Sequence, residues 1–96
     1  MTKIRKIVLD VLKPHQPDIV EYSERVSEMK HVTGVSIFLA EVDQETESIK
    51  VVIEGASLNF GLIRRAIEEL SGSIHSIDAV YAGERIIEEV DTPQDR

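Results

Sequence analysis

The stretch from Val35 to Glu54, VSIFLAEVDQETESIKVVIE, decides the fold of this chain. Apolar residues occupy every second position in 35–40 and again in 49–54, which is the period of half-buried β-strands. The segment that separates them, Asp43 to Glu47, is short and acidic. These residues therefore predict a β-hairpin near the middle of the sequence.

An amphipathic helix pattern lies on each side of the hairpin. Residues 19–29 and residues 60–70 repeat apolar side chains at spacings of three and four. An apolar run at 4–12 precedes the first pattern, and a further strand-like segment at 73–82 follows the second. The predicted order is β-α-β-β-α-β, which is the ferredoxin-like plait. In this α+β fold, two helices cover one face of a four-stranded antiparallel sheet.

The two faces of the predicted sheet differ in composition. Right-handed crossovers place both helices on one face, where the expected residues are all Val, Ile or Leu: Ile7, Leu9, Val11, Val35, Ile37, Leu39, Ile49, Val51 and Ile53. The open face mixes charged and apolar residues: Lys6, Val8, Asp10, Leu12, Ser36, Phe38, Ala40, Val42, Lys50, Val52 and Glu54. In 73–82 the apolar residues fall on both parities, so we expect a β-bulge there.

Glycines punctuate the second half of the chain. Gly72 follows the second helix pattern and is expected to be its left-handed C-cap. Gly83 ends the last strand, so residues 84–96 form a C-terminal arm and tail in which Ile86 and Ile87 would point to opposite sides. An uncovered apolar face usually marks an interface. We therefore expect a homo-oligomer held by the open sheet face, by the edge strand at 35–40 or by this arm.

Composition limits the partners. The 96 residues fit one domain, 1–96, and 18 acidic against 11 basic side chains give a net charge of −7. This charge repels phosphate backbones and anionic membranes, so no nucleic-acid or membrane partner is expected. The chain has no cysteine, and none of its apolar runs approaches the ~20 residues that span a bilayer. A cytoplasmic location is the simplest expectation.

Several functions of plait proteins are not expected here. RNA-binding plaits stack bases on aromatic residues of the central strands, where this chain offers Val8, Asp10, Val52 and Glu54. Heavy-metal carriers need a cysteine pair. Acylphosphatase-like hydrolases need an arginine and a glycine-containing loop after the first strand, and residues 13–17, KPHQP, contain neither.

Asp10 suggests a cation site, because it interrupts an apolar strand at the centre of the sheet. The neighbouring strand contributes Asp78, with His75 close by. Two carboxylates on one half-buried surface repel each other unless a cation, an arginine or a proton stands between them. We therefore predict that Asp10, His75 and Asp78 bind calcium or magnesium. The alternative is a salt bridge from Asp10 to Lys6, to Arg85 or to a neighbouring subunit.

The chain resembles a family of proteins known as the archaeal conserved region, domain of unknown function family 211. The resemblance is carried in the same order by segments 7–15, 32–35, 45–47, 72–76 and 88–90. It implies a ferredoxin-like fold, a tendency to form homo-oligomers and an archaeal, cytoplasmic source. It supplies no established activity and no catalytic residues.

The leading hypothesis is a homo-oligomeric, non-enzymatic module that binds a small ligand or a metal ion, in the manner of a sensor. One alternative is a metal-dependent enzyme that uses His15, His75 and Asp10 on a small molecule. The other alternative is a purely structural assembly protein that binds no ligand.

Overall fold

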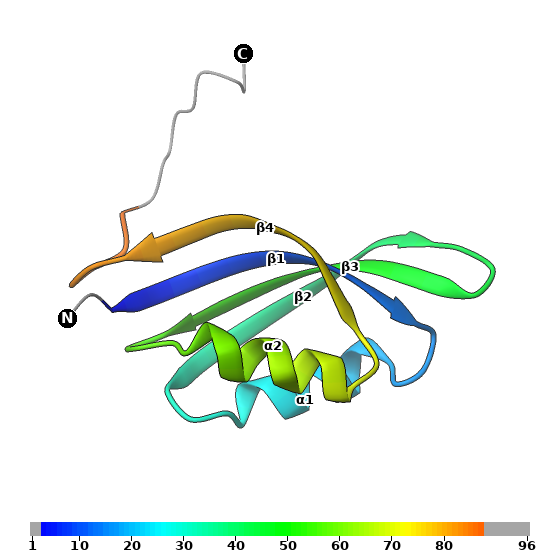
Figure 1. Cartoon of the computed structure of the whole chain (residues 1–96), viewed down its shortest axis with the longest axis horizontal. Coiled ribbons are helices and arrows are strands. Elements are labelled where there is room, and N and C mark those ends of the chain that lie inside the picture. Colours follow the sequence, from blue (N-terminus) through cyan, green and yellow to red (C-terminus); the bar gives the residue numbers. More distant parts are fainter. Residues whose placement is uncertain (1–2, 88–96) are drawn as a thin grey trace, which may run out of the picture.

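The computed structural model of the chain describes residues 3–87. Its elements are β1 (Ile4–Pro14), α1 (Ile19–Ser27), β2 (Val32–Val42), β3 (Thr46–Gly55), α2 (Phe60–Glu69) and β4 (Ser73–Ala82). The strands form one antiparallel sheet in the order β2-β3-β1-β4. Both helices lie side by side along the same face of this sheet (Figure 1). The predicted ferredoxin-like plait is therefore confirmed.

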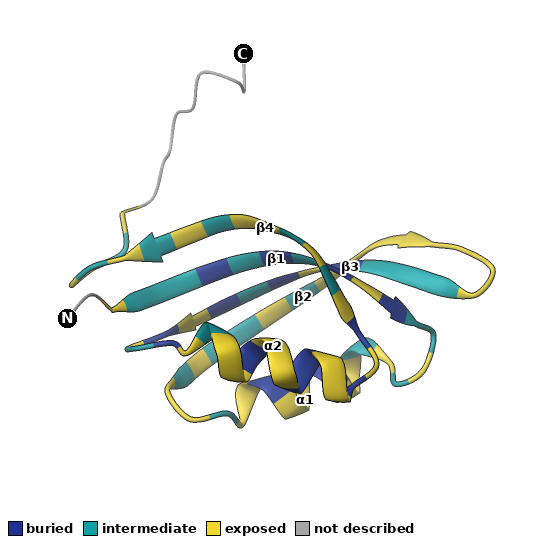
Figure 2. Cartoon of the chain, viewed as in Figure 1, coloured by how far each residue is buried: buried dark blue, intermediate teal, exposed yellow. Residues whose placement is uncertain are grey.

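The core lies between the central strands and the helices. All six helix-facing residues predicted for β1 and β3 are buried: Ile7, Leu9, Val11, Ile49, Val51 and Ile53. They pack against Tyr22 and Val26 of α1 and against Ile63 and Ile67 of α2. Burial is concentrated on β1, β3 and the inner sides of the helices (Figure 2). The alternation of apolar residues thus predicted the core of the two central strands correctly.

Strand β4 contains the predicted bulges. Ile74, Ile77 and Val80 lie opposite Val11, Leu9 and Ile7, with register shifts between them. His75 and Asp78 are the extra residues at these shifts. Because each bulge changes the parity of the strand, three apolar residues spaced three apart reach the same face of the sheet.

A bulge in β2 overturns one assignment to the open face. Leu39 pairs with Ile49, but the next pair is Glu41 with Ser48, so Ala40 is the extra residue. Val42 then lies opposite Glu47, whose β1 partner Lys13 is buried on the side of the helices. The prediction of Val42 on the open face was wrong, because the bulge exchanges its side with that of Glu41.

The end of α2 also differs from expectation. Ser71, not Gly72, has the left-handed backbone, with φ of 69°. Gly72 is needed for space instead: a Cβ atom there would lie 2.8 Å from the Tyr22 Oη and 2.9 Å from the Ile67 Cγ2. The predicted C-cap at Gly72 was therefore wrong by one residue.

Past β4, residues 84–87 of the predicted arm form no strand. The rest of that arm and tail, 88–96, lies outside the described residues. The arm is tied to β1, because the Arg5 guanidinium donates to the Glu84 carbonyl and the Gly83 N–H donates to the Lys3 carbonyl. Neither helix within residues 3–87 has the length and hydropathy that crossing a bilayer would require.

Candidate functional site

Asp10 lies at the centre of the open sheet face. Its backbone pairs with Lys50 of β3 on one side and with Ser76 of β4 on the other. Asp78, the second predicted carboxylate, is the extra residue of the neighbouring bulge in β4. The two acidic residues therefore belong to the same region of the sheet, as expected from the sequence.

A lysine stands at this carboxylate pair. The Lys50 Nζ lies 2.9 Å from the Asp78 Oδ2, and the Ser76 hydroxyl donates to the Asp78 Oδ1 at 2.7 Å. The hydrogen bond from Lys50, followed by that from Ser76, lowers the pKa of the Asp78 carboxyl below its ordinary value. Asp78, with a smaller contribution from Asp10, raises the pKa of the Lys50 ammonium. Lys50 thus supplies the positive charge beside the two carboxylates. The sequence had suggested a metal ion, Lys6 or Arg85 for this place.

A hollow of about 270 Å³ lies beside Asp10. Asp10 and His75, two of the three predicted metal ligands, line it together with Glu41 and Ser48. Within residues 3–87, however, no three His, Asp or Glu side chains stand close enough to hold a metal ion by themselves. Sequence reasoning missed Glu41, because only the bulge at Ala40 moves it onto the open face.

His15 belongs to a different cluster, where β1 ends against the β2–β3 hairpin. The His15 Nδ1 lies 2.9 Å from the Glu47 Oε2, and its Nε2 lies 3.0 Å from the carbonyl oxygen of Gln44. The Lys13 Nζ binds the other oxygen of Glu47 at 2.9 Å. The structure thus places His75, and not His15, in the hollow with Asp10.

Lys13 is the one buried charged side chain within residues 3–87. Its ammonium donates to the Pro14 carbonyl at 2.8 Å and lies 5.2 Å from the centre of the Tyr22 ring. A buried ammonium needs a carboxylate, hydrogen-bond acceptors or an aromatic face to offset its lost hydration. Lys13 has all three, and these contacts connect the end of β1 to β3 and to α1.

The fold and the open face define this chain as a ferredoxin-like plait with an ion-paired, half-apolar sheet surface. The model of the uncharacterized ArCR family, domain of unknown function 211, matches residues 5–96. The chain therefore belongs to this family.

A similar protein is the uncharacterized protein MJ0319 of Methanocaldococcus jannaschii. It is 53% identical over 96 residues, which cover 100% of this chain and 99% of the relative. The two matches support the expected archaeal origin and leave the function of the family open.

Proposed function

We propose that this protein is a self-associating, non-enzymatic module that assembles through the two edges of its sheet. The observation that carries the proposal is that both edge strands present large apolar side chains to solvent. Edge strands in soluble proteins are normally shortened, charged or covered, because their free backbone groups and apolar side chains pair with other chains. Here β2 spans 11 residues and β4 spans 10.

The β2 edge is apolar on both of its faces. Phe38 points to the open face and is 58% exposed, whereas Leu39 points to the side of the helices and is 50% exposed. Val42, at the hairpin end of the same strand, is 58% exposed. The helices end short of this part of the hairpin (Figure 1). Burial of these side chains by a second copy would remove apolar surface from water, at about 25 cal/mol per Å².

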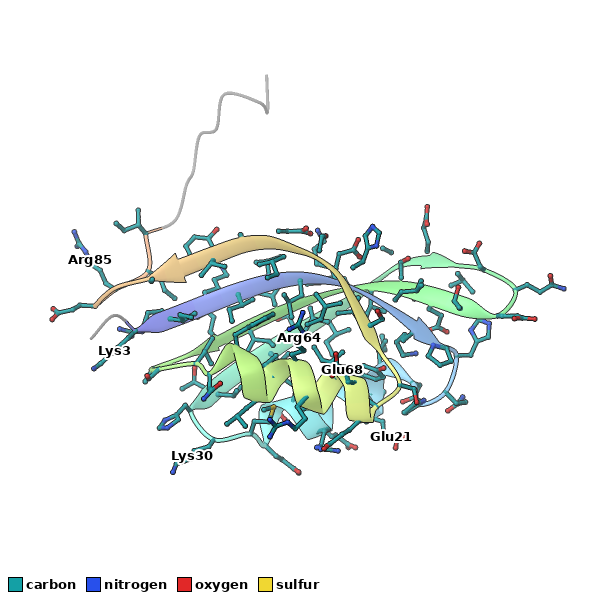
Figure 3. The ribbon with its side chains drawn as sticks, in the orientation of Figure 1. Lys3, Glu21, Lys30, Arg64, Glu68 and Arg85 are labelled. Atoms are coloured by element: carbon teal, nitrogen blue, oxygen red, sulfur yellow. The ribbon has the colours of Figure 1, made fainter. Side chains whose placement is uncertain are left out.

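The large exposed apolar side chains of the β4 edge lie on the helix side. Ile77 and Val80 are paired with the buried residues Leu9 and Ile7, yet they are 51% and 53% exposed. By contrast, the outer side of α2 is charged, with Arg64 and Glu68 labelled there in Figure 3 and their ion pair measuring 3.9 Å. The apolar surface is thus concentrated on the strands rather than on this helix.

The two edges are unlike and lie on opposite sides of the sheet. If β2 of one copy pairs with β4 of the next, the contact is heterologous and propagates until a ring closes. If like edges pair, the product is a twofold dimer. We propose that β2 of one copy pairs with β4 of the next, because both of these unlike edges carry exposed apolar side chains.

Edge-specific variants test this proposal. We expect a β2-edge variant (Phe38→Ser with Leu39→Ser) and a β4-edge variant (Ile77→Ser with Val80→Ser) each to lower the molar mass measured by light scattering. Val20→Ser is the matched control, because Val20 is 61% exposed but lies on α1. A mixture of the two edge variants should form a heterodimer, because one intact β2 edge and one intact β4 edge remain. Variants that assemble like the wild type would refute the proposal.

A second proposal concerns the ligand. The hollow lined by Asp10, Glu41 and His75 supports binding of a hard divalent cation, calcium or magnesium, as the cargo of the module. Because no three of these side chains within residues 3–87 stand close enough to hold an ion together, Asp10 would supply the carboxylate ligand, and water would complete the coordination, as it does around magnesium. The cation should raise the melting temperature according to the binding linkage. Asp10→Asn should abolish this response, and Asp43→Asn in the exposed turn should not. A wild type whose melting temperature ignores both ions and chelator would end this proposal.

We propose a non-enzymatic module because Lys13 and His15, which could act as a nucleophile or a general base, are already engaged by the protein. Lys13 is enclosed, and both ring nitrogens of His15 already face protein acceptors. The metal-dependent enzyme considered at the outset would need His15 beside His75 and Asp10. Retained calcium or magnesium without turnover of any substrate would favour the binding module.

A further inference from the structure

The β2–β3 hairpin extends beyond the ends of the helices (Figure 1). Its turn closes with a hydrogen bond from the Asp43 N–H to the Thr46 carbonyl at 2.8 Å. Apart from the strand ladders, side chains from the end of β1 hold this turn: Lys13 and His15 both reach Glu47, and His15 also reaches the turn carbonyl of Gln44. These polar contacts add to the strand ladders in positioning the turn.

Lys13 fixes Glu47 in place. Its ammonium is fully enclosed, binds the Glu47 Oε1 at 2.9 Å and faces the Tyr22 ring. A carboxylate, a carbonyl and an aromatic face surround the ammonium there and offset its lost hydration. One oxygen of Glu47 is thus permanently occupied, and the other remains for His15.

Both ring nitrogens of His15 face acceptors. The Nδ1 lies 2.9 Å from a carboxylate oxygen and the Nε2 lies 3.0 Å from a carbonyl oxygen. A neutral imidazole has one N–H and donates to only one of these acceptors, whereas an imidazolium donates to both. The His15 side chain is 40% exposed, so the ring is accessible to solvent.

We propose that His15 is a proton-operated latch that ties the hairpin turn at 43–46 to the segment after β1. The latch is closed when the imidazolium donates to Glu47 and to Gln44. Loss of the proton leaves one of these acceptors without its donor and opens the latch on the turn side or on the Glu47 side. This inference stands independently of the proposed assembly and of the proposed cation.

The charged groups around the latch come from several elements. Glu47 of β3 and the carbonyl of Gln44 favour the imidazolium, and loss of hydration opposes it, while Lys13 of β1 binds the other carboxylate oxygen of Glu47. Asp43 of the turn acts through its backbone carbonyl. On the side of α1, Asp18 is engaged with the Glu21 N–H of its own helix. The hydrogen bond to Glu47 outweighs the other effects and raises the pKa of the His15 imidazole.

The raised pKa of His15 and the lowered pKa of Glu47 determine how the stability of the latch depends on pH. Stabilisation by a group with a raised pKa is complete below its ordinary value and is lost as the pH rises through the raised value. His15 first and Lys13 second lower the pKa of the Glu47 carboxyl. At the acid end, the latch is lost as the pH falls through that lowered value. It is therefore closed from weakly acidic pH to a value above the ordinary pKa of histidine.

Nuclear magnetic resonance of the full chain tests the latch. The ring resonances of His15 and the amides of Gln44 and Glu45 would be followed from about pH 5 to about pH 9. The expected ring midpoint lies above about 6.5, and the turn amides should shift with the same midpoint. In His15→Gln, that titration of the turn amides should disappear.

The control is His31→Asn, because His31 lies at the other end of β2 with φ of 73°, a conformation that asparagine tolerates. This variant should keep the titration of the turn amides. A His15 ring midpoint at or below about 6.5, or turn amides that do not follow the ring, would overturn the latch. These two results come from the wild type, so the test stands even if His15→Gln folds poorly.

Discussion

Lys50 shows how a single residue changes the meaning of a sequence pattern. Asp10 and Asp78 read as a pair of repelling carboxylates, which required a salt-bridge partner or a bound cation between them. In the structure, Lys50 bonds Asp78 at 2.9 Å and pairs across the sheet with Asp10. The parity of β3 already placed Lys50 on the open face, so this partner could have been found from the β1–β3 register.

The pH dependence of the Lys50–Asp78 pair is the first prediction. The lowered pKa of Asp78 means that its stabilisation is present above the ordinary pKa and is lost as the pH falls through the lowered value. Asp78→Asn should therefore lower the melting temperature slightly near pH 7. The difference from the wild type should shrink towards about pH 3. Calorimetry at several pH values measures it, with Glu45→Gln as the control, and a difference independent of pH would argue against the pair.

Tyr22 provides a prediction about a buried hydroxyl. Its Oη donates to the Leu70 carbonyl at 2.7 Å, and burial raises the pKa of Tyr22 to about 12, so the group remains a donor. Tyr22→Phe keeps the ring against Lys13 but leaves that carbonyl unpaired. The expected loss is about 1–2 kcal/mol of unfolding free energy. Urea denaturation measures it, with Tyr81→Phe as the comparison, and an equal loss in both variants would contradict this role.

At the level of elements, the sequence predicted which residues of the central strands face the core, but not those of the β2 edge beyond its bulge. Strict alternation in β1 and β3 predicted their buried residues, because both strands are central and helices cover one face. It failed at Val42 and Glu41, because a single bulge at Ala40 reverses the parity and leaves no signature in the residues themselves. The bulges of β4 were foreseen, because its apolar residues fit no single parity. Of the three residues predicted to bind a metal ion, Asp10 and His75 line one hollow, whereas Asp78 pairs with Lys50.

In the turn after α2, Ser71 and Gly72 differ in what their positions require. Ser71 has a left-handed backbone, whereas Gly72 has no room for a Cβ atom. Gly72→Ala should destabilise the chain by about 1–3 kcal/mol, because its Cβ would meet the Tyr22 Oη and the Ile67 Cγ2 at less than 3 Å. Ser71→Gly should stabilise it by about 1 kcal/mol, because glycine adopts the φ of 69° without strain. Thermal melts of both variants measure these effects. A Ser71→Gly variant less stable than the wild type would contradict the strain assigned to Ser71, and a Gly72→Ala variant as stable as the wild type would contradict the lack of space at Gly72.

At the scale of the whole molecule, the two faces of the sheet hold different groups. The helix-covered face holds the core, and the open face holds the ion pair and the hollow. The exposed apolar groups lie at the outer strands on either side, Phe38 and Leu39 on β2 and Ile77 and Val80 on β4. A single copy leaves both edges in water, which is the physical reason for the proposed assembly.

Native mass spectrometry of the untreated protein at tens of micromolar measures the mass of the assembly together with any retained ion. We expect a closed oligomer at a multiple of the 10.8 kDa chain mass. Both edge variants should fall towards a single copy, while Val20→Ser should keep the wild-type mass. A wild type that remains a monomer of 10.8 kDa at this concentration would contradict the central claim.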